Sequence, residues 1–138
     1  MVKQDLSHLN KHLTGLGNIL TPPGRYSATI LNAAVESSKN GNPQIVYHLD
    51  VEINSPKGLV RTVIYKFTQL IEPMIEFFLD EMTILKVTLT DMDELPTALS
   101  DLIGAVVEIE VAYNPGYQYP VPKFLRLVCK PRENCGHF

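Results

Sequence analysis

Residues 38–53 have the sequence SKNGNPQIVYHLDVEI, which carries the strongest indication of the fold. Asn40 and Gly41 stand between two apolar runs, and both residue types tolerate the positive φ angles that a tight hairpin turn requires. From Ile45 to Ile53 apolar side chains alternate with polar ones, which is the period of a strand with one buried face. This stretch therefore predicts two antiparallel strands joined by a short turn.

Similar patterns extend the predicted sheet on both sides of this hairpin. A Pro-Pro-Gly sequence at 22–24 predicts a turn before the first strand. A Pro-Lys-Gly sequence at 56–58 predicts another turn after the second strand. The predicted strands cover about residues 25–35, 44–53, 59–67, 105–111 and 123–128.

The spacing of the apolar residues changes from that of a strand to that of a helix between the third and fourth predicted strands. From about residue 68 to 85 apolar residues recur at helical spacing with acids between them, and Thr68 or Gln69 is placed to cap this helix. Residues 94–103 predict a second, shorter helix, with Gly104 placed to end it. Both helices are therefore expected in the connection between strands three and four.

This order of elements predicts a mainly β protein. Five strands with a helical connection between the third and fourth are the element order of an OB-fold, a Greek-key barrel. The expected OB-fold domain covers residues 21–130, between an N-terminal arm or short helix at 1–20 and a C-terminal tail at 131–138. The sequence shows neither an apolar run long enough for a bilayer nor the apolar run of a secretory signal, so a cytoplasmic protein without a membrane partner is expected.

The acids around residue 92 do not predict a metal site. Asp91, Asp93 and Glu94 resemble part of a calcium loop, but the segment lacks the remaining ligands and the central glycine. They are better interpreted as N-terminal caps of the second helix. The sequence also contains no glycine-rich phosphate loop and no serine nucleophile elbow, so it predicts neither a cofactor nor an enzyme.

The histidines and cysteines support the same conclusion. His8 and His12 are spaced for one helix face but lack the acid of a metalloprotease motif, and they are expected on the surface. Cys129, Cys135 and His137 do not have the spacing of a common zinc finger. In a cytoplasmic protein the two cysteines are expected to be free thiols.

The distribution of charge is more informative than its sum. The chain has 12 basic and 15 acidic residues, which gives a formal net charge of −3. Ten of the acids and one base, Lys86, fall between Glu72 and Glu110, so that segment carries −9 and the rest of the chain +6. Most of the acids thus belong to the helical connection, and the excess of base belongs to the remaining chain.

The basic and aromatic residues of the predicted barrel form a candidate binding site. Single-stranded nucleic acid is held by a basic groove along its phosphates and by aromatic rings that stack on its bases. In an OB-fold the groove crosses strands two and three, between the loop after strand one and the loop after strand four. The candidate nucleic-acid-binding residues are Lys39, Asn40, Lys57, Arg61, Tyr65, Lys66, Tyr117, Tyr119, Lys123 and Arg126.

Several aromatic residues have a structural alternative. Tyr65, Tyr117 and Tyr119 remain open between a binding role and simple packing, because the outward face of strand three and the path of the late loop are not fixed by the pattern. The aromatic residues expected in the core or in helix packing are Tyr26, Tyr47, Phe67, Phe77 and Phe78.

Over about residues 22–128 the chain resembles a family of small phage proteins with an OB-fold that bind single-stranded DNA. The similarity is carried by PPGRY at 22–26, SKNGNP at 38–43, LIGAVV at 102–107, Tyr113 and the tyrosine-containing loop before Phe124. The resemblance implies non-sequence-specific coating of exposed strands in phage DNA replication or recombination, in the host cytoplasm, alongside proteins of those processes.

Two further expectations concern partners. Edge strands of the sheet can pair between copies, so a homodimer is one of them. The alternative function is a protein-interaction module in which the acidic helical surface, with Glu72, Glu76 and Asp80, docks a partner protein.

Overall fold

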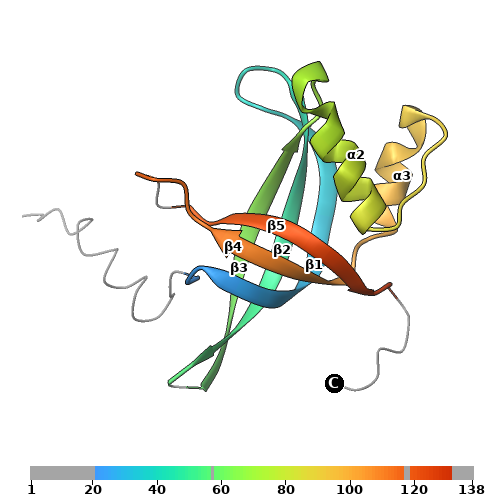
Figure 1. The fold of residues 1–138 in the computed structure, drawn as a ribbon. Coiled ribbons are helices and arrows are strands. Elements are labelled where there is room, and N and C mark those ends of the chain that lie inside the picture. The colour runs from blue at the N-terminus through green and yellow to red at the C-terminus, as the bar shows by residue number, and fades with distance from the viewer. Residues whose placement is uncertain (1–20, 57, 117–118, 132–138) are drawn as a thin grey trace, which may run out of the picture.

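The computed structural model describes residues 21–56, 58–116 and 119–131, and within them a mainly β architecture (Figure 1). The arm predicted at 1–20 and nearly all of the predicted tail lie outside the described residues. The strands are β1 (Gly24–Ser37), β2 (Pro43–Ser55), β3 (Gly58–Gln69), β4 (Val106–Ala112) and β5 (Val121–Cys129). The helical segments are η2 (Glu72–Met74), α2 (Ile75–Ile84), η3 (Met92–Glu94) and α3 (Leu95–Ser100).

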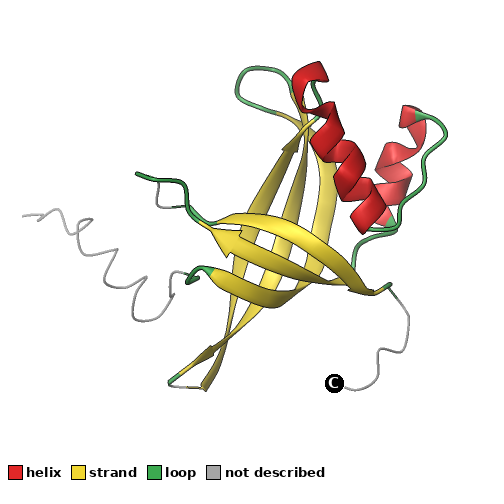
Figure 2. Cartoon of the chain, in the orientation of Figure 1, coloured by secondary structure: helices red, strands yellow, loops and turns green. Residues whose placement is uncertain are grey.

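All five strands belong to one antiparallel sheet with the order β3-β2-β1-β4-β5. The first half of β1 pairs with β4 and the second half with β2, and the register shifts between Ile30 and Asn32. Such an irregularity bends a strand, which allows β1 to pair with both β2 and β4. Figure 2 shows the two helices on one side of this curved sheet.

The edge strands β3 and β5 lie near one another, but the sheet is not closed into a barrel. The expected OB-fold barrel is therefore not confirmed, whereas the five antiparallel strands and the helical connection between β3 and β4 are. No helix of the described chain is long and apolar enough to cross a membrane.

The predicted turn between β1 and β2 is present, with a different geometry from a two-residue hairpin. Ser38 N donates to Asn42 O at 2.7 Å, and Gly41 N donates to Ser38 O at 2.9 Å. Gly41 alone takes the left-handed conformation in this turn, with φ at 83°. The sequence therefore located the hairpin correctly, although Asn40 does not share the positive φ that was expected for both central residues.

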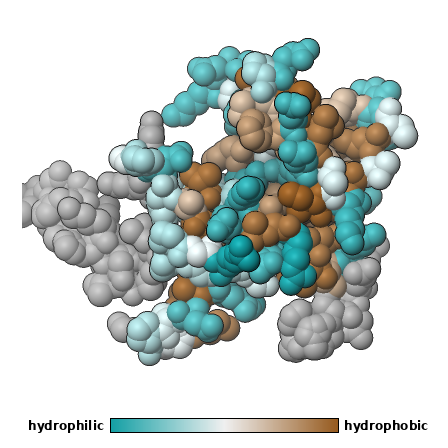
Figure 3. Space-filling view, in the orientation of Figure 1, coloured by the Kyte–Doolittle hydropathy of each residue, from teal (hydrophilic) through white to brown (hydrophobic). Residues whose placement is uncertain are grey.

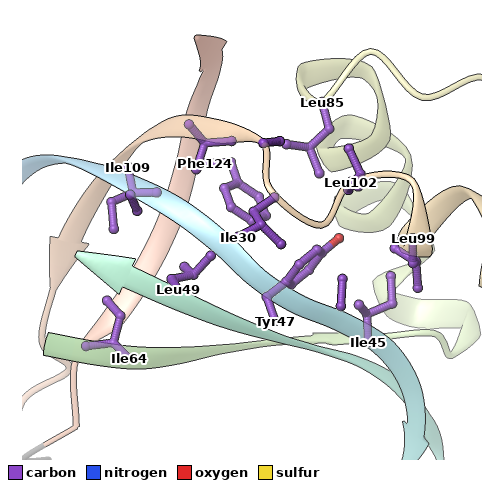
Figure 4. Close-up of a cluster of buried hydrophobic side chains, with 14 of the residues drawn as sticks. Ile30, Ile45, Tyr47, Leu49, Ile64, Leu85, Leu99, Leu102, Ile109 and Phe124 are labelled. Carbon is purple, nitrogen blue, oxygen red and sulfur yellow. The ribbon is translucent and has the colours of Figure 1, made fainter. Parts of the chain in front are cut away.

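The core lies between the concave face of the sheet and the helices (Figure 4). The five residues on the inner face of β2 are buried, as their alternation predicted; they are Ile45, Tyr47, Leu49, Val51 and Ile53. The Tyr47 and Phe124 rings meet edge to face with centroids 5.0 Å apart. Leu85, Leu99 and Leu102 contribute to the same cluster from the helical connection.

The helical connection differs from the prediction at its start. Thr68 and Gln69 belong to β3 and do not cap a helix, and α2 is preceded by the single turn of η2. Asp91 does cap the second helical segment, because its side chain accepts a hydrogen bond from Asp93 N at 2.8 Å. The turn after α3 ends at Gly104, whose φ is 98°.

Two other expectations are corrected by side-chain environments. Phe77 was expected to take part in helix packing, but it is 63% exposed, while its neighbour Phe78 is buried. Cys129 is disulfide-bonded, so the expectation of a free thiol is wrong for this residue. Its counterpart in the sequence, Cys135, lies outside the described residues.

Candidate nucleic-acid interface

The outward face of β3 is unusually rich in exposed apolar and aromatic side chains. Arg61, Val63, Tyr65 and Phe67 share this face, since alternate residues of a strand point the same way, and Ile64 points into the core. Tyr65 is 50% exposed and Phe67 is 58% exposed. The expectation that Phe67 belongs to the core is therefore wrong, because β3 continues to Gln69 and keeps Phe67 in the outward phase.

The neighbouring strand adds a third ring to this face. His48 of β2 lies opposite Tyr65 in the strand register. Their ring centroids are 4.9 Å apart, with the planes at 89°. Such an edge-to-face contact holds the two rings in a fixed relation. We call the three residues His48, Tyr65 and Phe67 the aromatic row.

Arg61 lies on the same face as the aromatic row, but its charge is balanced. Its guanidinium donates to Asp50 Oδ2 at 2.9 Å and to Glu52 Oε1 at 2.6 Å. The hydrogen bond to Glu52 and the charges of both acids raise the pKa of Arg61 above its ordinary value. A phosphate at this position would have to compete with two carboxylates for the guanidinium.

Lys66 lies away from this face, on the inner side of β3. Its ammonium donates to Glu81 Oε1 and, at 3.0 Å, to Thr68 Oγ1. It also lies 5.2 Å from the centre of the Phe124 ring. Lys66 is therefore committed to a partly buried ion pair with α2 and is removed from the candidate interface.

Glu81, the partner of Lys66, is held by β2 as well as β3. The Tyr47 hydroxyl donates to Glu81 Oε2 at 2.7 Å, and the Thr68 hydroxyl lies 2.9 Å from both carboxylate oxygens. Burial, followed by the charge of Glu81 and this hydrogen bond, raises the pKa of Tyr47 well above its ordinary value. This network attaches α2 to the inner face of the sheet.

The loops supply some of the remaining candidates. Lys39 and Asn40 are exposed in the turn between β1 and β2. Tyr119 is 76% exposed in the connection between β4 and β5. Lys57 and Tyr117 lie outside the described residues.

The two candidates on β5 are exposed and lie opposite acids of β4. Arg126 pairs with Glu108, with Arg126 Nε and Glu108 Oε1 2.9 Å apart. Lys123 is in register with Glu110, although the described residues form no ion pair with Lys123. The strands thus carry acids opposite their bases, and the excess of base expected for the sheet is partly neutralised across neighbouring strands.

Two further tyrosines near this region have structural roles. The Tyr26 hydroxyl donates to Pro22 O at 2.6 Å, and the Tyr113 hydroxyl donates to Thr21 O. Burial raises the pKa of both tyrosines, with a further contribution from Tyr26 at Tyr113. These contacts hold the segment that leads into β1.

Sequence reasoning missed His48 and Phe67 as members of the interface. His48 lies on the polar side of the β2 alternation, so its outward direction could have been expected, but its pairing with Tyr65 depends on the register between β2 and β3. Among the described residues, no group of three His, Cys, Asp or Glu side chains is arranged to hold a metal ion.

The sequence matches none of the protein families and none of the curated proteins with which it was compared. The roles assigned to individual residues therefore depend on the geometry of this chain.

Proposed function

We propose that this protein binds single-stranded DNA without sequence specificity, through the aromatic row on the outward face of β2 and β3. The observation that carries the proposal is the exposure of Tyr65 and Phe67 on one face of a strand, with His48 packed against Tyr65. Every base has a π-face, so a surface of exposed rings accepts bases of any identity.

The exposure of these rings favours a ligand with flat apolar faces. Tyr65 and Phe67 are separated by one residue on an extended strand, which places them about 7 Å apart along it. Stacking of a base on an aromatic side chain contributes about 1–3 kcal/mol per base. Two or three such contacts are enough for useful affinity with only a few phosphate contacts.

The strand order supports an OB-fold as the scaffold of this proposal. The order β3-β2-β1-β4-β5 brings the edge strands β3 and β5 near one another, as an OB-fold requires, and the helices lie between β3 and β4. The aromatic row then occupies the face formed by strands two and three, where OB-folds bind oligonucleotides. The resemblance to phage single-strand binders extends the proposal to phage DNA replication or recombination.

Titration of a labelled oligothymidine of about 20 nucleotides at low and moderate salt tests this function. We expect binding by fluorescence anisotropy, with weaker affinity for the same sequence as a duplex. No binding at low salt would exclude the function.

Substitution of the aromatic row tests the site itself. Tyr65→Ala and Phe67→Ala should each weaken binding by about 1–3 kcal/mol, because each removes one stacking ring. Tyr65→Phe keeps the ring and should bind almost as the parent protein does. Leu59→Ala is the matched control, since Leu59 is an exposed apolar residue of β3 without a ring. Equal affinities for all four variants would remove the aromatic row from the interface.

A further inference from the structure

Two large apolar side chains of α2, those of Phe77 and Leu79, are left uncovered by the described chain. They are two residues apart and therefore lie on opposite edges of the outward half of the helix. Phe77 is 63% exposed and Leu79 is 54% exposed. The fold is held by other residues of the same helix, because Phe78 and Met82 are buried against the core. Phe77 and Leu79 therefore contribute little to the core and remain available to a partner.

The same part of the helix is acidic. Glu72, Glu76 and Asp80 are exposed at intervals of four residues, which places them along one side of η2 and α2. Neither segment contains a lysine or arginine, and these three carboxylates form no ion pair with the described residues. Glu81 is different, since it is buried and paired with Lys66. Figure 3 shows hydrophobic and hydrophilic residues side by side at the end of the molecule where α2 lies.

We propose that Glu72, Glu76, Phe77, Leu79 and Asp80, together the α2 surface, dock a basic amphipathic segment of a partner protein. Charge complementarity selects this occupant, because lysines and arginines of the segment would pair with three carboxylates that have no cation of their own. Apolar side chains along both edges of the segment would cover Phe77 and Leu79, which lie on either side of the carboxylates. A nucleic acid is excluded here by charge repulsion.

The α2 surface and the aromatic row can be occupied at the same time. Lys66 and Thr68, on the inner face of β3, contact Glu81 of α2. Tyr65 and Phe67 alternate with them and point to the opposite face. A partner on α2 therefore leaves the aromatic row accessible, and the docking proposal does not depend on DNA binding.

The size of the surface sets the expected affinity. α2 is a helix of 10 residues, so the contact lies at the small end of specific interfaces, below about 1,200 Å². Interfaces of this size are transient, and a dissociation constant on the order of micromolar is expected. Screening of the ionic contacts should weaken it as salt increases.

The probe for this surface is a fluorescein-labelled amphipathic peptide of about 18 residues, made of lysine and leucine and long enough for five helical turns. A peptide in which glutamate replaces each lysine is its charge control. We expect the full chain to bind the first peptide at low salt and not the second. Binding of both peptides with equal affinity, or of neither, would overturn the proposal.

Variants of the α2 surface show whether the peptide binds there. Phe77→Ala/Leu79→Ala should weaken binding at least about tenfold, because two apolar anchors are lost. Glu76→Gln/Asp80→Asn should weaken it about as much and reduce its dependence on salt. Ile103→Ala is the matched control, since Ile103 is an exposed apolar residue outside α2. Equal peptide affinities for the parent, the two double variants and this control would refute the docking site.

The oligothymidine titration of the same variants separates this proposal from the proposed function. Phe77→Ala/Leu79→Ala should bind the oligonucleotide within about twofold of the parent protein, because the aromatic row is unchanged. If this variant lost affinity for both the peptide and the oligonucleotide, the proposal that the two ligands bind at separate surfaces would be contradicted. Peptide binding by a parent protein that does not bind the oligonucleotide would support the docking site and refute only the DNA-binding function.

Discussion

Glu81 shows how a single residue links the helical connection to the sheet. Its carboxylate is buried and accepts hydrogen bonds from Tyr47, Lys66 and Thr68. A buried carboxylate is tolerated only when it is paired and its oxygens are hydrogen-bonded. The position of α2 on the sheet therefore depends on all three donors.

Removal of the cation from this network should be strongly destabilising. Lys66→Met leaves Glu81 buried without its counter-charge, and we expect a loss of about 3–5 kcal/mol of unfolding free energy in urea titrations. The double variant Lys66→Met/Glu81→Leu replaces the pair with apolar groups and should recover most of that loss. A double variant as unstable as Lys66→Met would show that Glu81 is not the source of the penalty.

Tyr47 should make the fold sensitive to alkali. Because its pKa is raised above the ordinary value of about 10, the folded state holds this proton more tightly than the unfolded state does. Its contribution to stability is fully present below that ordinary value and is lost as pH rises towards the folded pKa. Tyr47→Phe removes the hydrogen bond to Glu81 and should be less stable than the parent near neutral pH, but its stability should fall less steeply above about pH 10, as followed by circular dichroism. An equally steep fall for the two proteins would contradict this assignment.

At the scale of elements, the turn between β1 and β2 provides a clean test of backbone conformation. Gly41 has φ at 83°, and a Cβ added there meets no atom within 4 Å. Gly41→Ala should therefore lower stability by about 1–2 kcal/mol through backbone strain alone. Gly41→Asn should cost less, because asparagine tolerates the left-handed region better than alanine. Thermal unfolding of the two variants measures the difference, and equal losses would show that φ is not the cause.

The strands were predictable from sequence because their alternation reflects burial directly. The outward row of Arg61, Val63 and Tyr65 follows from a period of two, as the structure has it. The same rule could have removed Lys66 from the site, since adjacent strand residues point to opposite faces. Alternation therefore assigns faces within one strand more reliably than composition assigns a site.

The errors in the helical connection have a different physical origin. A helix beginning at residue 68 would turn Phe67 inward, but β3 continues to Gln69 and the helical segments begin only at Glu72. Phe77 shares the helical spacing of its neighbours yet lies beyond the strip that contacts the sheet. Helix boundaries and helix rotation depend on tertiary packing, which local sequence does not record.

On the scale of the whole molecule, the distribution of charge separates two surfaces. Glu72, Glu76 and Asp80 of η2 and α2 form no ion pair with the described residues. By contrast, Asp50 and Glu52 of β2 are paired with Arg61, and Glu108 of β4 is paired with Arg126. A phosphate chain is therefore repelled by α2 and meets a nearly neutral sheet. The proposed DNA binding should depend on stacking more than on ionic contacts, with Lys39 as an exposed cation that has no ion pair in the described chain.

The near balance of acidic and basic side chains on the sheet predicts how DNA affinity changes with salt. Each cation that neutralises a phosphate of a single strand contributes about 0.7 to the slope of log K against log salt. Lys39→Gln should reduce the magnitude of the slope by about that amount.

Arg61→Gln should leave the slope nearly unchanged. When Arg61 leaves Asp50 and Glu52 for a phosphate, the two carboxylates bind salt cations, which offsets the cations released from the DNA. Conversely, Asp50→Asn/Glu52→Gln frees Arg61 and should steepen the slope by at least about 0.7. Oligothymidine titrations at four salt concentrations (about 20–200 mM) measure these slopes. The opposite result would be a steep slope that decreases in Arg61→Gln and stays unchanged in Asp50→Asn/Glu52→Gln. It would show that Arg61 contacts phosphate even while its two carboxylates are present.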